Sequence, residues 1–226
     1  DGVLYTKGHE ELICVPIAKD FSSAGNCYTI NGNTKKIRVD AIGETTTLQK
    51  LVIPASVNNI YMDSWPTFAY TPTYLKVDAN NATYCSVDGV VYSKDKTKLI
   101  YYPGGKEDAT FKVPDGVTSI PNGFSISWNK HLTTIDFNQV ENLGEFAISA
   151  CYKLKVINIP KTLTSIGDAA FSIFANLEKY VVDPDNPNYS SDTDGVLFNK
   201  DKTQLLAYPP GREGEYTIPN SVTQIG

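Results

Sequence analysis

Two stretches of this 226-residue sequence are near copies of each other, and this repetition limits the possible folds more than any other feature. Residues 88–102 and 194–208 share nine of fifteen positions, including an Asp-Gly-Val start and an identical Lys-Asp-Lys-Thr segment. A third, degenerate copy opens the chain as Asp1-Gly-Val-Leu-Tyr5. Self-similarity at a fixed period is typical of architectures in which one structural unit stacks on the next. A stacked fold is therefore the first expectation.

A shorter unit, L-x-x-I-x-I-P, recurs between these copies and is clearest at residues 154–160. Its last strand hydrophobe recurs at spacings of 23, 24, 36, 24, 22, 23 and 36 residues. Both 36-residue steps contain an Asp-Gly-Val segment, and the extra residues are enough for one β-hairpin, so we expect hairpins inserted between regular units. The anchor positions that define these spacings are Ile30, Ile53, Val77, Val113, Phe137, Ile159, Val182 and Ile218.

The alternation within each unit predicts short strands. Two apolar residues two positions apart face the same side of a strand, and the residue between them faces the other side. A strand with only two or three inward side chains cannot bury them alone, so each unit must stack on its copies. A second apolar pair, such as Leu163 and Ile166 after Ile159, then closes the far side of each coil. The pattern indicates a solenoid of parallel strands.

Composition excludes several classes of protein. Hydrophobic residues make up 41% of the chain and charged residues 20%, which is typical of a folded domain. The net charge of −5 argues against a nucleic-acid partner. No apolar run reaches the roughly 18 residues that cross a bilayer, so we expect no membrane-spanning segment in this chain. The four cysteines lack a C-x-x-C spacing, which favours free thiols and leaves a Cys14–Cys27 disulfide open.

The full unit, L-x-x-I-x-I-P-x-x-V-x-x-I-G-x-x-A-F-x-x-C-x-x-L, resembles the BspA-type leucine-rich repeat of surface proteins from anaerobic bacteria and some parasitic protists. Residues 147–154 match its A-F-x-x-C-x-x-L segment, with Ile at the aromatic position. The resemblance implies a leucine-rich-repeat solenoid, a right-handed β/α superhelix of short parallel strands with short helical or irregular returns. It also implies that Cys151 is a buried thiol. Residues 61–72 and 121–131 depart from the pattern.

On this basis we expect one leucine-rich repeat domain over residues 1–226. Hairpin modules are predicted near 1–16, 88–103 and 194–209. The last unit stops mid-repeat at Ile225-Gly226, whereas a solenoid needs covered ends. We therefore expect the chain to be a fragment of a longer protein, or to be capped by its final hairpin.

The sequence contains no recognisable set of nucleophile, base and orienting residue, so we expect no enzyme. No cofactor is expected, and a three-histidine metal site is impossible with two histidines. Two alternatives stay open. Asp183, Asp185, Asp192 and Asp194 lie close enough in sequence to consider calcium, although Pro187 breaks the EF-hand pattern. Asp136, Glu141 and Glu145 are acids that a glycoside-active enzyme could use.

Outward positions of the predicted strands, together with two tryptophans in the irregular repeats, are the candidate ligand-binding residues. An exposed face of parallel strands offers a broad surface, and aromatic rings suit a glycan or protein partner. Core packing is the competing interpretation for the tryptophans, and an ordinary solvated face is the competing one for the strands. The candidates are Lys50, Tyr74, Lys76, Asp136, Asn158, Lys179, Trp65 and Trp128.

These features predict a non-catalytic cell-surface or secreted repeat protein that binds a protein or glycan ligand, in adhesion or host interaction. A structural spacer module without its own ligand is the alternative. The resemblance implies an extracellular or cell-surface location, with a lipid anchor upstream of Asp1 as a further expectation. We expect the protein to be a monomer.

Overall fold

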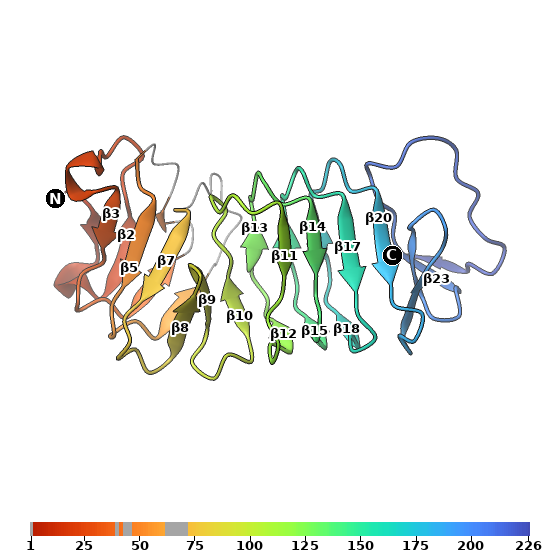
Figure 1. Ribbon diagram of the computed structural model, residues 1–226, viewed down its shortest axis with the longest axis horizontal. Coiled ribbons are helices and arrows are strands. Elements are labelled where there is room, and N and C mark those ends of the chain that lie inside the picture. Colours follow the sequence, from red (N-terminus) through yellow and green to blue (C-terminus); the bar gives the residue numbers. More distant parts are fainter. Residues whose placement is uncertain (1, 39–40, 43–46, 62–71) are drawn as a thin grey trace. The chain divides into compact units, whose positions relative to one another are not determined.

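Short strands joined by tight turns make up the structure, a computed structural model (Figure 1). The strands group into two compact units. The first unit contains residues 1–107 and 123–129, and the second contains residues 108–122 and 130–226. The residues that the structure describes are 2–38, 41–42, 47–61 and 72–226.

The second unit is a stack of coils, each of which passes through separate parallel sheets. Its first sheet has the order β11–β14–β17–β20, and these strands lie side by side in Figure 1. Further along each coil, β12, β15 and β18 form a second sheet, and β16 pairs with β19. The bounds are β11 Thr110–Lys112, β12 Ser119–Ile120, β14 Thr134–Asp136, β15 Asn142–Leu143, β16 Ile148–Ser149, β17 Val156–Ile159, β18 Ser165–Ile166, β19 Phe171–Ser172 and β20 Lys179–Val182.

Exact register between coils places like residues above one another. Ile135, Ile157 and Tyr180 occupy one row and are buried, as period-two alternation requires. The strands of this sheet end at tight turns. In the turn after β17, the Leu163 N–H donates a hydrogen bond to the Pro160 carbonyl oxygen at 3.2 Å. Removing such a row from water stabilises the stack by about 1.5–3 kcal/mol for each large apolar side chain.

The first unit repeats this arrangement. It contains one sheet ordered β1–β2–β4–β6, one ordered β3–β5–β7 and one ordered β10–β9–β8. Two 3₁₀ helices, η1 (Lys7–His9) and η2 (Ser22–Ala24), are short. The strands are β1 Leu4–Tyr5, β2 Glu11–Cys14, β3 Cys27–Thr29, β4 Lys36–Arg38, β5 Lys50–Ile53, β6 Asn59–Tyr61, β7 Tyr74–Val77, β8 Tyr84–Val87, β9 Val90–Ser93, β10 Leu99–Tyr101 and β13 Ile126–Ser127.

Antiparallel strands interrupt the parallel stacks in both units. In the first unit, β1 pairs with β2 and β9 pairs with β8 and β10. In the second unit, β22 pairs with β21 and β23, and β23 then pairs in parallel with β24. The bounds are β21 Tyr189–Ser191, β22 Leu197–Asn199, β23 Gln204–Ala207 and β24 Gln224–Ile225. The single-domain assignment and its hairpin modules stay predictions.

The returns were expected to be short helical or irregular segments, and the helical alternative is wrong. Within the described ranges, the returns are two- or three-residue strands and turns, such as β15 and β16, instead of α-helix. The physical reason is length, because the roughly five residues between successive strands are too few to offset the cost of helix nucleation. The handedness expected for the superhelix stays a prediction.

Most of the anchor residues are buried, with one clear exception. Val113 and Phe137 are fully buried, and Ile159 is 2% exposed. Ile218 was expected to face inward but is 42% exposed, since residues 216–219 form no strand in the parallel ladder. All four cysteines are free thiols, and Cys151 is fully buried, as the repeat resemblance implied.

Candidate ligand-binding face

The outward side of β11, β14, β17 and β20, here called the outer face, carries two rows of side chains across four coils. Asp136 on β14 pairs in register with Asn158 on β17, and Asn158 pairs with Val181 on β20. Val156 lies beside Lys179 in the neighbouring row. The complete rows are Thr110, Thr134, Val156 and Lys179 in one, and Lys112, Asp136, Asn158 and Val181 in the other.

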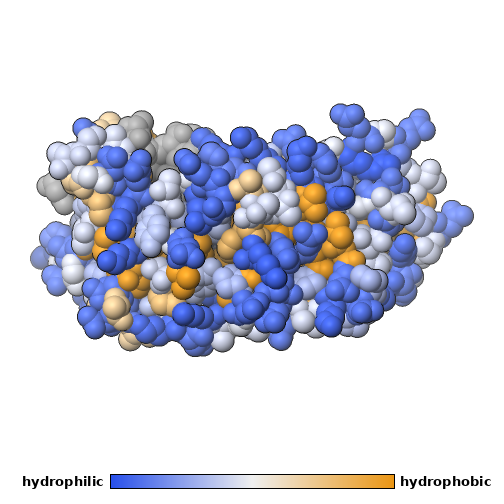
Figure 2. All heavy atoms as spheres, in the orientation of Figure 1, coloured by the Kyte–Doolittle hydropathy of each residue, from blue (hydrophilic) through white to orange (hydrophobic). Residues whose placement is uncertain are grey.

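Apolar and polar groups are mixed on the outer face. Figure 2 shows hydrophobic residues gathered over β17 and β20 with hydrophilic residues around them. Val181 is 40% exposed, a large fraction for an apolar strand residue, and Lys179 two positions earlier is also exposed. Asp136 accepts a hydrogen bond from the Asn138 backbone N–H at 2.8 Å, which fixes the carboxylate at the end of β14. The face therefore offers a cation, a carboxylate, an amide and valine surface together.

The first unit presents a comparable face on β3, β5 and β7. Lys50 pairs in register with Tyr74, and the Lys50 Nζ lies 5.7 Å from the centroid of the Tyr74 ring, within range of a cation–π contact. Tyr74 is 41% exposed, and Lys76 is exposed on the same side of β7. The structure thus brings together Lys50, Tyr74 and Lys76 on the first unit, and Asp136, Asn158 and Lys179 on the second.

A glycine turn closes the edge of each face. The Leu75 N–H donates to the Gly89 carbonyl oxygen at 3.0 Å, and the Tyr180 N–H donates to the Gly195 carbonyl oxygen at 2.9 Å. Gly195 has a φ of +77°, and a Cβ at this position would lie 2.2 Å from the Cβ of Lys179. Only glycine allows the Asp-Gly-Val turn to approach the strand this closely. The inserted segments therefore dock directly against β7 and β20.

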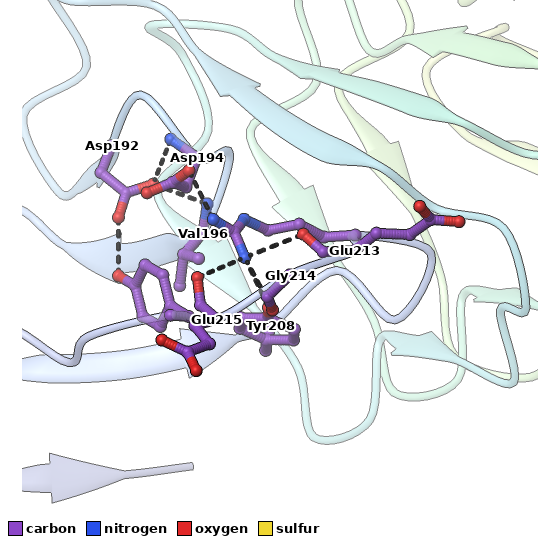
Figure 3. A network of polar contacts seen from close by, with 9 residues as sticks. Asp192, Asp194, Val196, Tyr208, Glu213, Gly214 and Glu215 are labelled. Carbon is purple, nitrogen blue, oxygen red and sulfur yellow. Dashed lines mark hydrogen bonds and ion pairs between the residues drawn. The ribbon is translucent and has the colours of Figure 1, made fainter.

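A polar network centred on Arg212 holds the loop beyond β23 (Figure 3). The Arg212 guanidinium donates to the Asp194 carboxylate at 2.7 Å and lies 5.4 Å from the centroid of the Tyr216 ring. The Tyr216 hydroxyl donates to Asp192 at 2.6 Å. The bond to Asp194 raises the pKa of Arg212 above its ordinary value, and burial raises the pKa of Tyr216. These contacts stabilise the loop and use both carboxylates.

Three of the four aspartates considered for calcium use their carboxylates in local contacts. Asp183 accepts the Asp185 backbone N–H at 2.9 Å, while Asp192 and Asp194 belong to the network around Arg212. Among residues whose positions the structure describes, no group of three or more His, Cys, Asp or Glu side chains could hold a metal ion. The described part of the chain likewise has no helix that is long and apolar enough to cross a membrane.

The remaining candidates do not join either face. Trp65 lies outside the described residues. Trp128 is partly buried, and its ring centroid lies 5.4 Å from that of Phe124, which is a packing contact. Of the acids considered for glycoside chemistry, Asp136 belongs to the sheet of β14, whereas Glu145 follows β15 in another sheet. The prediction of a ligand site at these residues stays untested.

Sequence reasoning missed two features of the second unit. The Arg212 network joins residues that are 18 and 24 positions apart, so no local motif marks it. A hollow beside β12, β15 and β18 was also missed. The available signal for this hollow was a glycine directly after an apolar residue in two successive units, Leu143-Gly144 and Ile166-Gly167.

Comparisons with known proteins agree with this architecture. Residues 107–193 match the BspA type leucine-rich repeat region in six copies. A leucine-rich repeat protein from Eubacterium ventriosum aligns over 88% of this chain and 53% of its own length, with 23% identity and a TM-score of 0.57. The pneumococcal vaccine antigen PcpA aligns over 86% and 55%, with 20% identity and a TM-score of 0.52. This chain thus spans about half the length of either structure. No curated protein matches it.

Proposed function

We propose that this chain, whose residues 107–193 form a BspA type leucine-rich repeat region, is a non-catalytic cell-surface protein that binds another protein through the outer face. Its fold is that of a leucine-rich repeat β-solenoid. Solenoids of this kind build extended surfaces from stacked repeats and do not depend on one enclosed pocket. We propose that binding through the outer face serves adhesion or interaction with a host.

The mixture of groups on the outer face is the observation that carries this proposal. Val156 and Val181 supply apolar area that a partner can cover, while Lys179 and Asp136 supply opposite charges that can orient it. The specific part of a protein interface combines such an apolar centre with polar and charged surroundings. The strand backbone below is hydrogen-bonded to both neighbours at β14 and β17, so these side chains are held at fixed spacing. A preorganised face loses little conformational entropy on binding.

The proposed location is the cell surface, with an anchor such as a lipid upstream of Asp1. The repeat family supports the surface location, and one solved structure with the same fold is a pneumococcal vaccine antigen. We take the protein to act as a monomer. Light scattering of the full-length protein extracted from the membrane measures its molar mass in solution and tests whether it is a monomer. Mass spectrometry of the same protein tests whether a lipid anchor is attached.

An array of purified matrix and cell-surface proteins tests the binding function. We expect the folded chain to bind at least one protein on the array, and the pair Lys179→Glu and Val181→Asp to weaken that binding at least tenfold. Lys153→Glu makes the same lysine-to-glutamate change at an exposed turn outside the outer face and serves as the control for that half of the pair. An array that stays blank with folded protein would favour the spacer function. An equal loss of binding affinity in the control and in the double variant would show that the binding site is not on the outer face.

A further inference from the structure

A hollow of about 560 Å³ lies against the second sheet of the second unit, away from the strands of the outer face. Three successive coils contribute to it through β12, β15 and β18. One wall is the row Ser119, Asn142 and Ser165, which pair with one another in exact parallel register. The rest of the lining comes from the turns after these strands, including Asn122, Glu145 and Gly167. The hollow is therefore a groove that crosses the coils.

The walls of this groove repeat by translation. Ser119, Asn142 and Ser165 occupy the same position in their coils, so their side chains recur at the strand spacing of about 4.8 Å. No hydrogen bond within the described residues uses these three side chains. Asn142 and Ser165 are exposed, and Ser119 is half-buried. The row thus presents hydroxyl, amide and hydroxyl groups that a ligand can reach.

Tight stacking of successive coils forms the part of the lining that comes from the turns. A Cβ on Gly144 would lie 2.3 Å from the Asn122 backbone nitrogen, and a Cβ on Gly167 would lie 2.6 Å from the Glu145 backbone nitrogen. The Asn122 side chain accepts the Glu145 N–H at 3.0 Å, which fastens one turn to the next. Both glycines are therefore required by the close approach of the coils.

Spacing and charge together identify the class of ligand. An extended peptide places side chains of one face about 6.6–6.8 Å apart, which does not match rungs at about 4.8 Å. A pyranose unit in an extended chain has a length close to the rung spacing and offers hydroxyls to each coil. None of the ten residues lining the groove is basic, and Glu145 is among them, so the groove disfavours anionic polysaccharides. A neutral sugar chain meets both conditions.

We infer that the groove formed by β12, β15 and β18 binds an extended neutral oligosaccharide, with one sugar unit on each coil. Asn142 lies in the middle of the row and contacts the central sugar, while Ser119 and Ser165 contact its neighbours. This site is separate from the outer face and does not depend on the protein-binding function proposed for it. The chain would accordingly present two faces to two kinds of ligand.

Nuclear magnetic resonance titration of the full chain with cellohexaose, chitohexaose and hyaluronan hexasaccharide tests this inference. We expect at least one neutral hexasaccharide to bind with a millimolar dissociation constant and to shift backbone amide signals at residues 119–122, 142–145 and 165–167. The anionic hyaluronan oligosaccharide should bind at least tenfold more weakly. Shifts confined to other residues, preference for hyaluronan, or no binding of either neutral sugar at about 5 mM would overturn the inference.

Matched variants locate the contacts. The double variant Asn142→Ala and Ser165→Ala should weaken binding of the neutral sugar at least fivefold, because it removes the polar groups that contact two of the three sugar units. Asn188→Ala removes an exposed amide of the same unit that lies outside both the groove and the outer face, and it should leave the affinity unchanged. Both substitutions in the double variant are at exposed positions, and circular dichroism confirms folding. An unchanged affinity in the double variant would place the sugar elsewhere, whatever the outcome for protein binding at the outer face.

Discussion

Asn186 donates its side-chain amide to the carbonyl oxygen of Pro160, one coil earlier in the stack, at 2.7 Å. The same amide donates to the Leu163 carbonyl oxygen at 3.1 Å, and its oxygen accepts the backbone N–H groups of Asn188 and Tyr189 at 2.8 Å each. Asn186 is fully buried. One side chain thus satisfies four backbone groups where an inserted hairpin leaves the regular coil. Asn81 does the same for Pro54 and Val57 in the first unit.

Replacing this asparagine should be costly. Asn186→Ala removes the partner of the Leu163 carbonyl and of the Asn188 and Tyr189 N–H groups, whereas the Pro160 carbonyl still accepts the Leu163 N–H. Each buried group left without a partner costs about 1–3 kcal/mol. We therefore expect a loss of about 3 kcal/mol or more in unfolding free energy, measured by chemical denaturation. Asn188→Ala, at an exposed site two residues away, is the control and should cost under about 0.5 kcal/mol. Similar losses in both variants would contradict the bridging role of Asn186.

The inside and outside of β17 can be tested with one substitution type. Ile159 is 2% exposed, so Ile159→Asp should bury an unpaired charge and cost more than about 3 kcal/mol. Asn158 points outward from the same strand, and Asn158→Asp should change stability little. Thermal melts of the two variants compare them directly. Equal effects would mean that the two residues face the same side.

Close approach of the Asp-Gly-Val turn to β20 predicts an unequal pair of glycine variants. Gly195 and Gly214 both have positive φ, but only Gly195 would place a Cβ against Lys179. Gly214→Ala should cost about 1–2 kcal/mol from backbone strain alone. Gly195→Ala should cost clearly more, because the turn must also move away from the strand. Denaturant midpoints measure the difference, and equal midpoints would show that the turn does not press on β20.

Asp95 at the tip between β9 and β10 predicts a pH-dependent contribution to stability. Hydrogen bonds from the Ser93 hydroxyl, and then from Thr97, lower the pKa of Asp95 from 3.8 to about 2. A lowered folded-state pKa stabilises the fold fully above the unfolded pKa, and this stabilisation is lost as the pH falls toward 2. Asp95→Ala should therefore be less stable than the wild-type chain at neutral pH.

The difference between these two proteins should shrink as the pH falls from about 4 to about 2, as measured by denaturation at each pH. Asp168→Ala removes an exposed carboxylate that accepts no hydrogen bond within the described residues, and its difference from wild type should stay constant. A gap between Asp95→Ala and wild type that persists to pH 2 would show that the carboxylate charge is not responsible.

Much of the repeat architecture was predictable because its cause is local. Ile135, Ile157 and the residues beside them alternate with period two, so their facing follows from strand geometry alone. The outward positions of Asp136, Asn158 and Lys179 followed from the same rule. The helical alternative for the returns and the inward position of Ile218 were wrong, because these depend on the chain length between strands and on the residues that pack against the last unit.

The sequence alone therefore determined the repeat, the stacked parallel strands and the sides of each strand that face the core or solvent. Tertiary structure decided the three-sided path of each coil, the four hydrogen bonds of Asn186, the Arg212 network and the groove beside Asn142. These features depend on how closely neighbouring coils pack. The hydrogen-bonded residues of Asn186 with Pro160 and of the Arg212 network are 18 to 26 positions apart in the sequence. A pattern within one repeat specifies which side chains turn inward, whereas only the packing of one coil on the next specifies what their polar groups meet.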